Sequence, residues 1–156
     1  MKKRVIAFVL FIVMSCSFVG VFADDLSYFQ NGAIELTTVR VNGAEFDFGG
    51  QPIIYRDRTF VPMRKLFETL GASVEWVDND QLIFATKKNM IYVMGIGQPN
   101  IVATDVAEGK GRTITLDVAP LLFRDKTYVP LRAVSETLGA KVDWDDETQT
   151  VDITLN

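Results

Sequence analysis

The sequence predicts an α+β fold of mainly antiparallel strands with two short helices, built from two similar hairpin-helix-hairpin halves that share one core. The first observation is an internal repeat: RDRTFVPMRKLFETLGASVEW, residues 56–76, returns 68 positions later as RDKTYVPLRAVSETLGAKVDW, residues 124–144. The second is that apolar spacing inside each copy changes from every second residue to every third or fourth, and then back. With 156 residues, 48% of them apolar, the chain can build such a core.

Each repeat opens with a predicted β-hairpin. PIIY and TFVP flank residues 56–58 in the first copy, and LLF and TYVP flank residues 124–126 in the second. Two apolar runs around a short charged break containing aspartate are typical of a hairpin whose turn faces water. An earlier hairpin is predicted at the Asn-Gly pair of residues 42 and 43. The hairpin aromatics are expected to pack within these units; they are Tyr55, Phe60, Phe123 and Tyr128.

Each hairpin leads into a predicted amphipathic helix. The apolar stripes at helical spacing are Met63, Leu66, Phe67 and Leu70 in the first copy and Leu131, Val134 and Leu138 in the second. Pro62 and Pro130 are predicted as the first helical residues, because proline has a fixed φ and no N–H to lose there. Gly71 and Gly139 are predicted where the chain leaves each helix in a left-handed conformation.

Alternation returns after each glycine and predicts a second hairpin in each half. Trp76 and Trp144 share a strand face with a valine, which favours core packing over an exposed platform for sugar rings. The halves therefore span residues 52–86 and 120–154. Further strands are predicted between them, and no Pro- or Ser-rich linker divides the two.

The N-terminus is typical of a secretory signal peptide over residues 1–23. The basic MKKR precedes an apolar run, and the small-residue site VFA precedes an acidic pair. The remaining chain divides into a lead-in, residues 24–36, and the repeat-containing domain, residues 37–156. We therefore expect a secreted protein that is extracellular or associated with the cell wall.

Two alternatives to cleavage stay open. Residues 5–23 approach the length that spans a bilayer, so the segment could remain as an anchor. Cys16 could instead be lipidated and make the protein a lipoprotein, although the apolar residues after it differ from the usual polar tether. Cutting after Ala23 leaves no cysteine, and thus no disulfide or thiolate chemistry.

Composition excludes most catalytic chemistry. The chain has no histidine, the usual metal ligand and general base, and the acidic run of residues 143–147 lacks the spacing of a calcium loop. Without Lys2, Lys3 and Arg4 there are 13 basic and 20 acidic residues, a net charge of −7, which argues against nucleic acid as a partner. We predict no catalytic residue, no metal and no cofactor.

Arg64 and Arg132 are the candidate ligand contacts. Each follows the repeated Val-Pro step and lies off the apolar stripe, so its guanidinium could tie the helix to the hairpin or contact an anion or a sugar. Glu68 and Glu136 lie four residues further on and are expected to form helix-surface ion pairs. A hydrolase that uses such acidic residues is a third and weaker hypothesis.

The repeated motif resembles the copper amine oxidase N-terminal-like domain family, also called the stalk domain. The family shows NG, then PII, T-x-V-P-L-R and E-x-L-G-A-x-V-x-W, and the similarity covers about residues 39–155. The resemblance implies a small helix and sheet module, common in secreted and surface proteins of Gram-positive bacteria, without agreed ligand or catalytic residues. Copper and the quinone cofactor of the amine oxidases belong to a separate catalytic domain.

The resemblance favours a non-enzymatic structural or interaction module of the cell envelope. Its expected partner is a cell-wall polymer or another surface protein. The alternative is a binding module for cell-wall glycan or peptide that uses Arg64 and Arg132. Pro62, Gly71, Trp76 and their counterparts Pro130, Gly139 and Trp144 are then structural motif residues.

Overall fold

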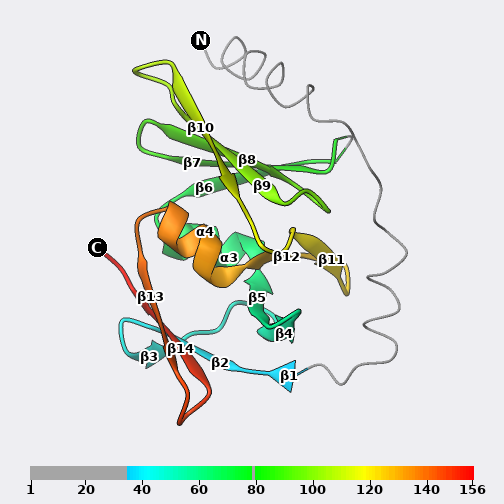
Figure 1. The fold of residues 1–156 in the computed structure, drawn as a ribbon, viewed down its shortest axis with the longest axis vertical. Helices are drawn as coiled ribbons and strands as arrows, with labels where there is room; N and C mark the ends of the chain where they lie inside the picture. The colour runs from blue at the N-terminus through cyan, green and yellow to red at the C-terminus, as the bar shows by residue number, and fades with distance from the viewer. Residues whose placement is uncertain (1–34, 79) are drawn as a thin grey trace.

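A computed structural model describes residues 35–78 and 80–156, so the signal-peptide prediction and most of the lead-in lie outside the described residues. The described residues form three sheets and two short helices, and the helices lie side by side between two of the sheets (Figure 1). The predicted α+β class with mainly antiparallel pairing is confirmed. The exception is one parallel pair, between β14 and β2.

The first sheet joins the opening hairpins of the two repeats. Its strand order is β1 (Glu35–Leu36), β4 (Ile53–Tyr55), β5 (Arg58–Pro62), β12 (Lys126–Pro130) and β11 (Leu121–Phe123). β4 and β5 form the predicted first hairpin, and β11 and β12 the second. Both residues of each two-residue turn have positive φ, which is the type I′ geometry that suits the twist of paired strands.

β5 and β12 pair about a local two-fold axis. Val61 is opposite Val129, its own counterpart in the repeat, and Phe60 is opposite Pro130 as Tyr128 is opposite Pro62. Both valines are fully buried. The repeated motif therefore pairs with itself at the centre of this sheet.

The prediction that Pro62 and Pro130 are the first helical residues is wrong. Each proline is the last residue of its strand, with ψ of 126° and 114°, and the helix begins at the next residue. The first hairpin closes at Tyr55 opposite Arg58, so the even-numbered residues of β5 bond toward β4 and Val61 bonds toward β12. The ladder between β5 and β12 therefore needs no hydrogen bond from either proline, which has no N–H to donate.

The helices α3 (Met63–Thr69) and α4 (Leu131–Thr137) end as predicted at their glycines. Gly71 and Gly139 have φ of 75° and 91°. The amide of Ala72 bonds Phe67 O at 2.9 Å and that of Gly71 bonds Glu68 O at 3.0 Å, and the second helix repeats both bonds. This is a Schellman motif, in which the glycine bears the left-handed turn.

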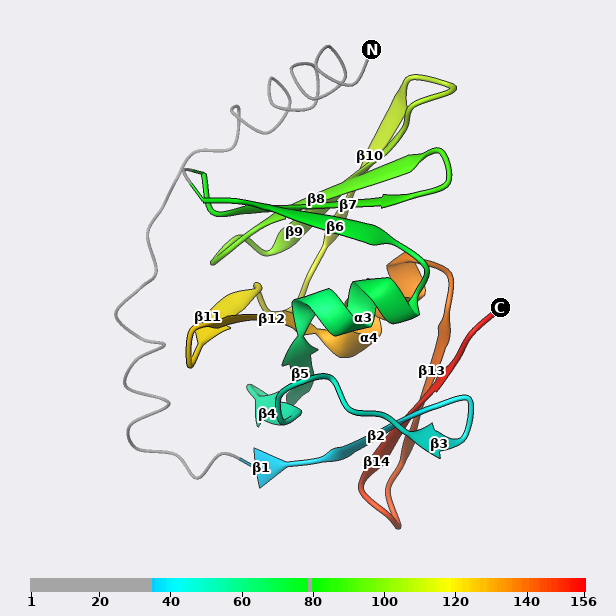
Figure 2. The same ribbon diagram turned by 180° about the vertical axis from the view of Figure 1, so that it is seen from behind.

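The second hairpins of the two repeats enter different sheets. One sheet has the order β10 (Lys110–Thr115), β9 (Asn100–Asp105), β8 (Met90–Gly95), β7 (Leu82–Lys87) and β6 (Ser73–Val77). The other has the order β13 (Lys141–Asp145), β14 (Thr150–Thr154), β2 (Thr38–Val41) and β3 (Ala44–Glu45). The predicted Asn42-Gly43 turn joins β2 to β3, with both φ values positive. The halves thus differ in their surroundings, and Figure 2 shows these two sheets on opposite sides of the helices.

The largest hydrophobic cluster takes side chains from both repeats. The two valines of the central pair lie in it with the apolar stripes of both helices. The aromatic hairpin residues form a smaller cluster, where Tyr55 packs on Phe60 and Phe123 packs on Tyr128, as expected. Lys87 of β7 adds a polar tie, because its Nζ donates to Leu138 O at the end of α4 at 2.7 Å.

We predict that Gly139→Ala lowers the free energy of unfolding by about 1 to 2 kcal/mol, the cost of placing an L-residue in the left-handed conformation. A Cβ at Gly139 meets no atom within 4 Å, so the loss would come from backbone strain and not from a clash. Chemical denaturation measures it, with Gly111→Ala as control because the φ of Gly111 is not left-handed. An unchanged unfolding midpoint for Gly139→Ala would contradict the assignment of the motif.

Candidate functional site

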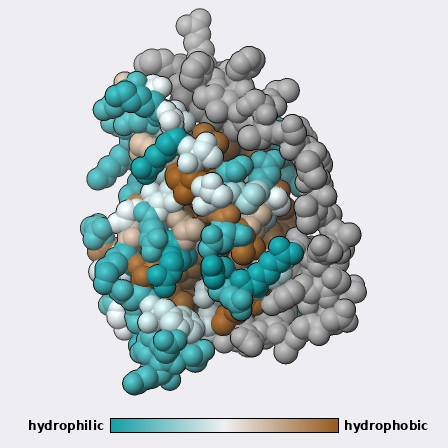
Figure 3. Space-filling view, viewed as in Figure 1, coloured by the Kyte–Doolittle hydropathy of each residue, from teal (hydrophilic) through white to brown (hydrophobic). Residues whose placement is uncertain are grey.

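A groove of about 700 Å³ runs beside α4, and we call it the α4 groove. The β4–β5 hairpin, the connection between β10 and β11, and strands β13 and β14 form its walls. Its apolar lining includes Ile54, Leu131, Val142, Trp144 and Val151. Its polar lining includes Asp57, Arg58, Thr115, Asp117, Arg132 and Glu136. Figure 3 shows apolar residues, in brown, between polar ones across the middle of the face on which α4 lies.

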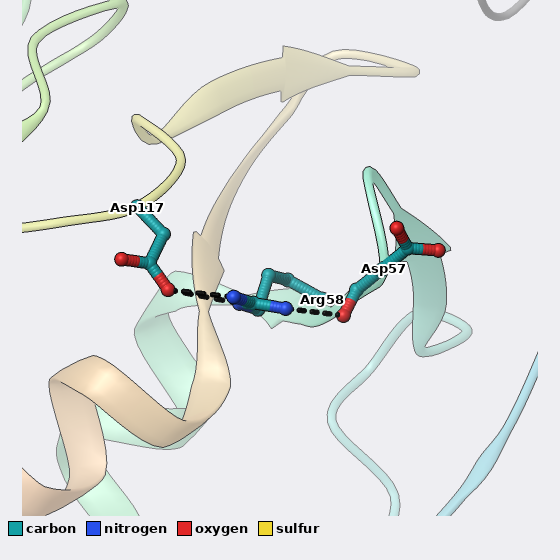
Figure 4. A network of polar contacts seen from close by, with 3 residues as sticks. All are labelled: Asp57, Arg58 and Asp117. Atoms are coloured by element: carbon teal, nitrogen blue, oxygen red, sulfur yellow. Dashed lines mark hydrogen bonds and ion pairs between the residues drawn. The ribbon is translucent and has the colours of Figure 1, made fainter.

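An ion pair between the first repeat and the segment that leads into the second crosses the rim of the groove. Arg58, at the start of β5, donates from Nη2 and Nε to Asp117 Oδ2 at 2.7 and 3.1 Å (Figure 4). Its Nη1 also donates to the backbone oxygen of Asp57 at 3.0 Å. The three bonds orient the guanidinium, although its side chain is 48% exposed and that of Asp117 is 72% exposed.

The local two-fold axis repeats this contact in another chemical form. Lys126 is the counterpart of Arg58, and Gly49 is the counterpart of Asp117, each 68 residues apart. The ammonium of Lys126 donates to Gly49 O. The first residue after each hairpin turn therefore contacts the segment that leads into the other repeat.

A part-buried bond also ties the second repeat to the segment that leads into the first. Tyr128 donates its hydroxyl to Gln51 O at 3.1 Å. Burial raises the pKa of the Tyr128 phenol above its ordinary value, and the positive charge of Arg124 opposes this rise only in part. The phenol therefore stays protonated and can donate at neutral pH.

Of the two candidate arginines, only Arg132 lines the α4 groove. Its Nη1 lies 4.0 Å from Glu136 Oε1, and both side chains are about half exposed, as expected for a helix-surface pair. Arg64 is exposed on α3. Within residues 35–78 and 80–156, neither guanidinium donates to a backbone carbonyl, and Arg64 forms no ion pair with Glu68.

The two tryptophans occupy equivalent places in different sheets. Trp76 lies in β6 and Trp144 in β13, and both are partly buried against the main cluster. Trp76 donates its indole N–H to Asp78 Oδ1, and Trp144 donates to Asp146 Oδ1 at 2.6 Å. Trp76 does not line the α4 groove. Trp144 contributes to the α4 groove with its indole N–H already bonded.

The acidic run of residues 143–147 includes the end of β13 and the turn that follows, and Asp145 stabilises that turn. Asp145 Oδ1 accepts from the amides of Glu147 at 2.9 Å and Thr148 at 3.2 Å. Hydrogen bonds from Thr148, the side-chain bond first, lower the pKa of the Asp145 carboxyl. In the part of the chain that the structure describes, no group of three or more acidic, histidine or cysteine residues is placed to hold a metal ion. No described helix is long and apolar enough to cross a membrane.

The α4 groove combines apolar and charged side chains. Its charged side chains include two arginines, and each of these has a carboxylate partner. The chain offers no histidine to activate a nucleophile. An apolar floor with charged groups at its rim can bury part of a ligand and orient the polar remainder.

Comparison with known protein families finds a match over most of the chain. The family model described as "Copper amine oxidase N-terminal domain" matches residues 40–153. The chain belongs to this family. In copper amine oxidases this domain is non-catalytic. No solved structure matches the chain.

One curated relative is a Brevibacillus choshinensis protein named "Protease inhibitor". It is 29% identical over 120 residues, which cover 73% of this chain and 33% of the relative. This chain therefore spans about a third of the length of that relative.

Arg58 and Asp117 were not predicted as site residues. The repeat contained a signal for Arg58, since a basic residue precedes the threonine of both copies, at positions 58 and 126. No local pattern marks Asp117, because its partner is 59 residues away and meets it only through the pairing of β5 with β12.

We predict that the Arg58–Asp117 coupling energy is below about 1 kcal/mol and falls as salt is added, because both side chains are well exposed. A double-mutant cycle of Arg58→Ala and Asp117→Ala, read by chemical denaturation, measures it. The cycle of Arg132→Ala and Glu136→Ala is the control and should give a smaller value, since that pair is 4.0 Å apart. A coupling above about 2 kcal/mol that salt does not change would contradict the surface character of the pair.

Proposed function

We propose that this chain is a secreted, non-enzymatic interaction module of the cell envelope, and that it contacts its partner through the α4 groove. The observation that carries the proposal is that the residues of the repeated motif have structural roles. Its valines pair the two repeats, its prolines and glycines bound the helices, and its apolar stripes fill the core. The exposed charges that remain beside an apolar floor suit binding.

Secretion is supported by the sequence of residues 1–23, with the uncleaved anchor and lipidation at Cys16 as the other routes to the envelope. We describe the domain as a duplicated hairpin-helix-hairpin unit, since each repeat contains these elements in this order. The two units have diverged in their surroundings, and the groove lies beside the second helix.

A polypeptide is the partner class that we favour over glycan. Sugar rings stack on open aromatic faces, whereas Trp144 is partly buried and its indole N–H is already bonded to Asp146. The name of the Brevibacillus relative, "Protease inhibitor", also directs attention to protein partners. Glycan binding by Arg64 and Arg132 remains the alternative, and the same experiment tests it.

The experiment uses the purified exported chain against purified peptidoglycan, wall polysaccharide and an extract of wall proteins, each immobilised separately. We expect retention on at least one surface and a loss of about tenfold or more for Arg132→Ala, a change equal to about 1.4 kcal/mol. Arg64→Ala is the matched control, because Arg64 is the repeat counterpart outside the groove. No retention of the wild type on any surface would reject the proposal. An equal loss for both variants would move the contact away from the α4 groove.

A further inference from the structure

The strand β10 is an open edge of its sheet. It pairs with β9 on one side, and no described strand pairs with its other side. Five of its six residues are exposed and the sixth, Ile114, is partly buried. Figure 1 shows the β9–β10 hairpin projecting beyond the helices. An open edge of this length can accept another strand.

The register shows which backbone groups of β10 are available. The amide of Leu116 bonds Pro99 O at 2.9 Å, directly beyond the pair Thr115–Asn100. Since bonded and non-bonded pairs alternate in an antiparallel ladder, the even-numbered residues of β10 bond β9. The N–H and C=O groups of the odd-numbered residues therefore point away from the sheet; these residues are Gly111, Thr113 and Thr115.

The other side of β9 shows the same alternation. The amide of Val106 bonds Asn89 O at 2.9 Å, so the even-numbered residues of β9 bond β8. The odd-numbered residues of β9 are then left for β10, as the register of that pair requires. The β8–β9 ladder and the β9–β10 ladder therefore both indicate that the odd-numbered backbone groups of β10 point away from β9.

The charged side chains of β10 indicate the charge that a complementary partner would have. Lys110 and Arg112 lie on one face of β10 and are exposed. Lys110 forms a surface ion pair with Glu108 at 3.1 Å, whereas Arg112 forms no ion pair with another described residue. A carboxylate directly across from Arg112 on an added strand would make a favourable cross-strand pair.

We propose that β10 binds an extended acidic peptide segment of a partner protein as an added strand. This inference rests on the proposed interaction function and names its partner class. Thr115 connects the two surfaces, because it is the last outward-facing residue of β10 and also lines the α4 groove. The open edge and the α4 groove are therefore adjacent at this residue.

A second copy of this chain fits the edge less well. Pairing β10 with itself brings two sets of Lys110 and Arg112 together, and like charges on neighbouring strands repel. Positive charge of this kind also discourages aggregation through edges. An acidic segment converts the same charge into attraction.

The test measures binding of a fluorescein-labelled heptapeptide of alternating threonine and glutamate, by fluorescence anisotropy. Thr113→Pro removes one outward N–H and no bond to β9, so the sheet should persist while affinity falls about tenfold or more. Thr113→Val keeps the N–H and is the matched control, with binding within about twofold of the wild type. A heptapeptide of alternating threonine and lysine should bind at least about tenfold more weakly, since it meets Arg112 with like charge.

Amide hydrogen exchange by NMR gives a readout that altered folding alone would not produce. The peptide should slow exchange at the amides of Gly111, Thr113 and Thr115, and leave those of Arg112 and Ile114 unchanged. No binding of the acidic peptide, equal protection at odd and even positions, or self-association of the chain through β10 would each overturn the inference. Because Thr113→Pro leaves Arg132 untouched, loss of the edge would not abolish retention through the α4 groove, and the two proposals can fail separately.

Discussion

The pairing of β5 with β12 is the interaction on which the rest of the structure depends. It places Val61 against Val129, so the hairpins of the two repeats form one continuous sheet. Both helices begin one residue after this ladder, and their apolar stripes therefore start from fixed points over the same core. Short helices of this kind are marginal alone, and packing against a shared core stabilises them.

The symmetry of the pairing ends beyond the helices, where the two repeats enter different sheets. The first repeat continues into an antiparallel sheet with β8, β9 and β10, whereas β14 of the second pairs in parallel with β2 from before the repeats. Inside the core, Phe67 has the small Ser135 as its counterpart, and both are fully buried. The hydroxyl of Ser135 has no hydrogen-bond partner among the described residues. No hydrogen bond among them therefore offsets the free-energy cost of burying this hydroxyl. The groove and the open edge meet at Thr115, on the connection that joins the repeats.

Local chemistry predicted the hairpins, the helices and their C-terminal ends. The Asn-Gly turn and the glycines Gly71 and Gly139 impose backbone conformations that few other residues adopt, so their positions could be read directly. Pro62 and Pro130 were misplaced by one residue, because proline is compatible with both a strand end and a helix start. The separate sheets, the parallel pair and the contact of Arg58 with Asp117 depend on long-range pairing, which local periodicity does not encode.

The central claim is that the two repeats fold as one unit through the Val61–Val129 pair. Native-state hydrogen exchange of the wild type and Val129→Ala tests it most directly, because it gives a free energy of opening for each helix separately. The account predicts that this core truncation lowers the values for α3 and α4 alike, by about 2 kcal/mol. If α4 lost protection while α3 kept its full value, the first repeat would be stable without the second, and the claim would be wrong.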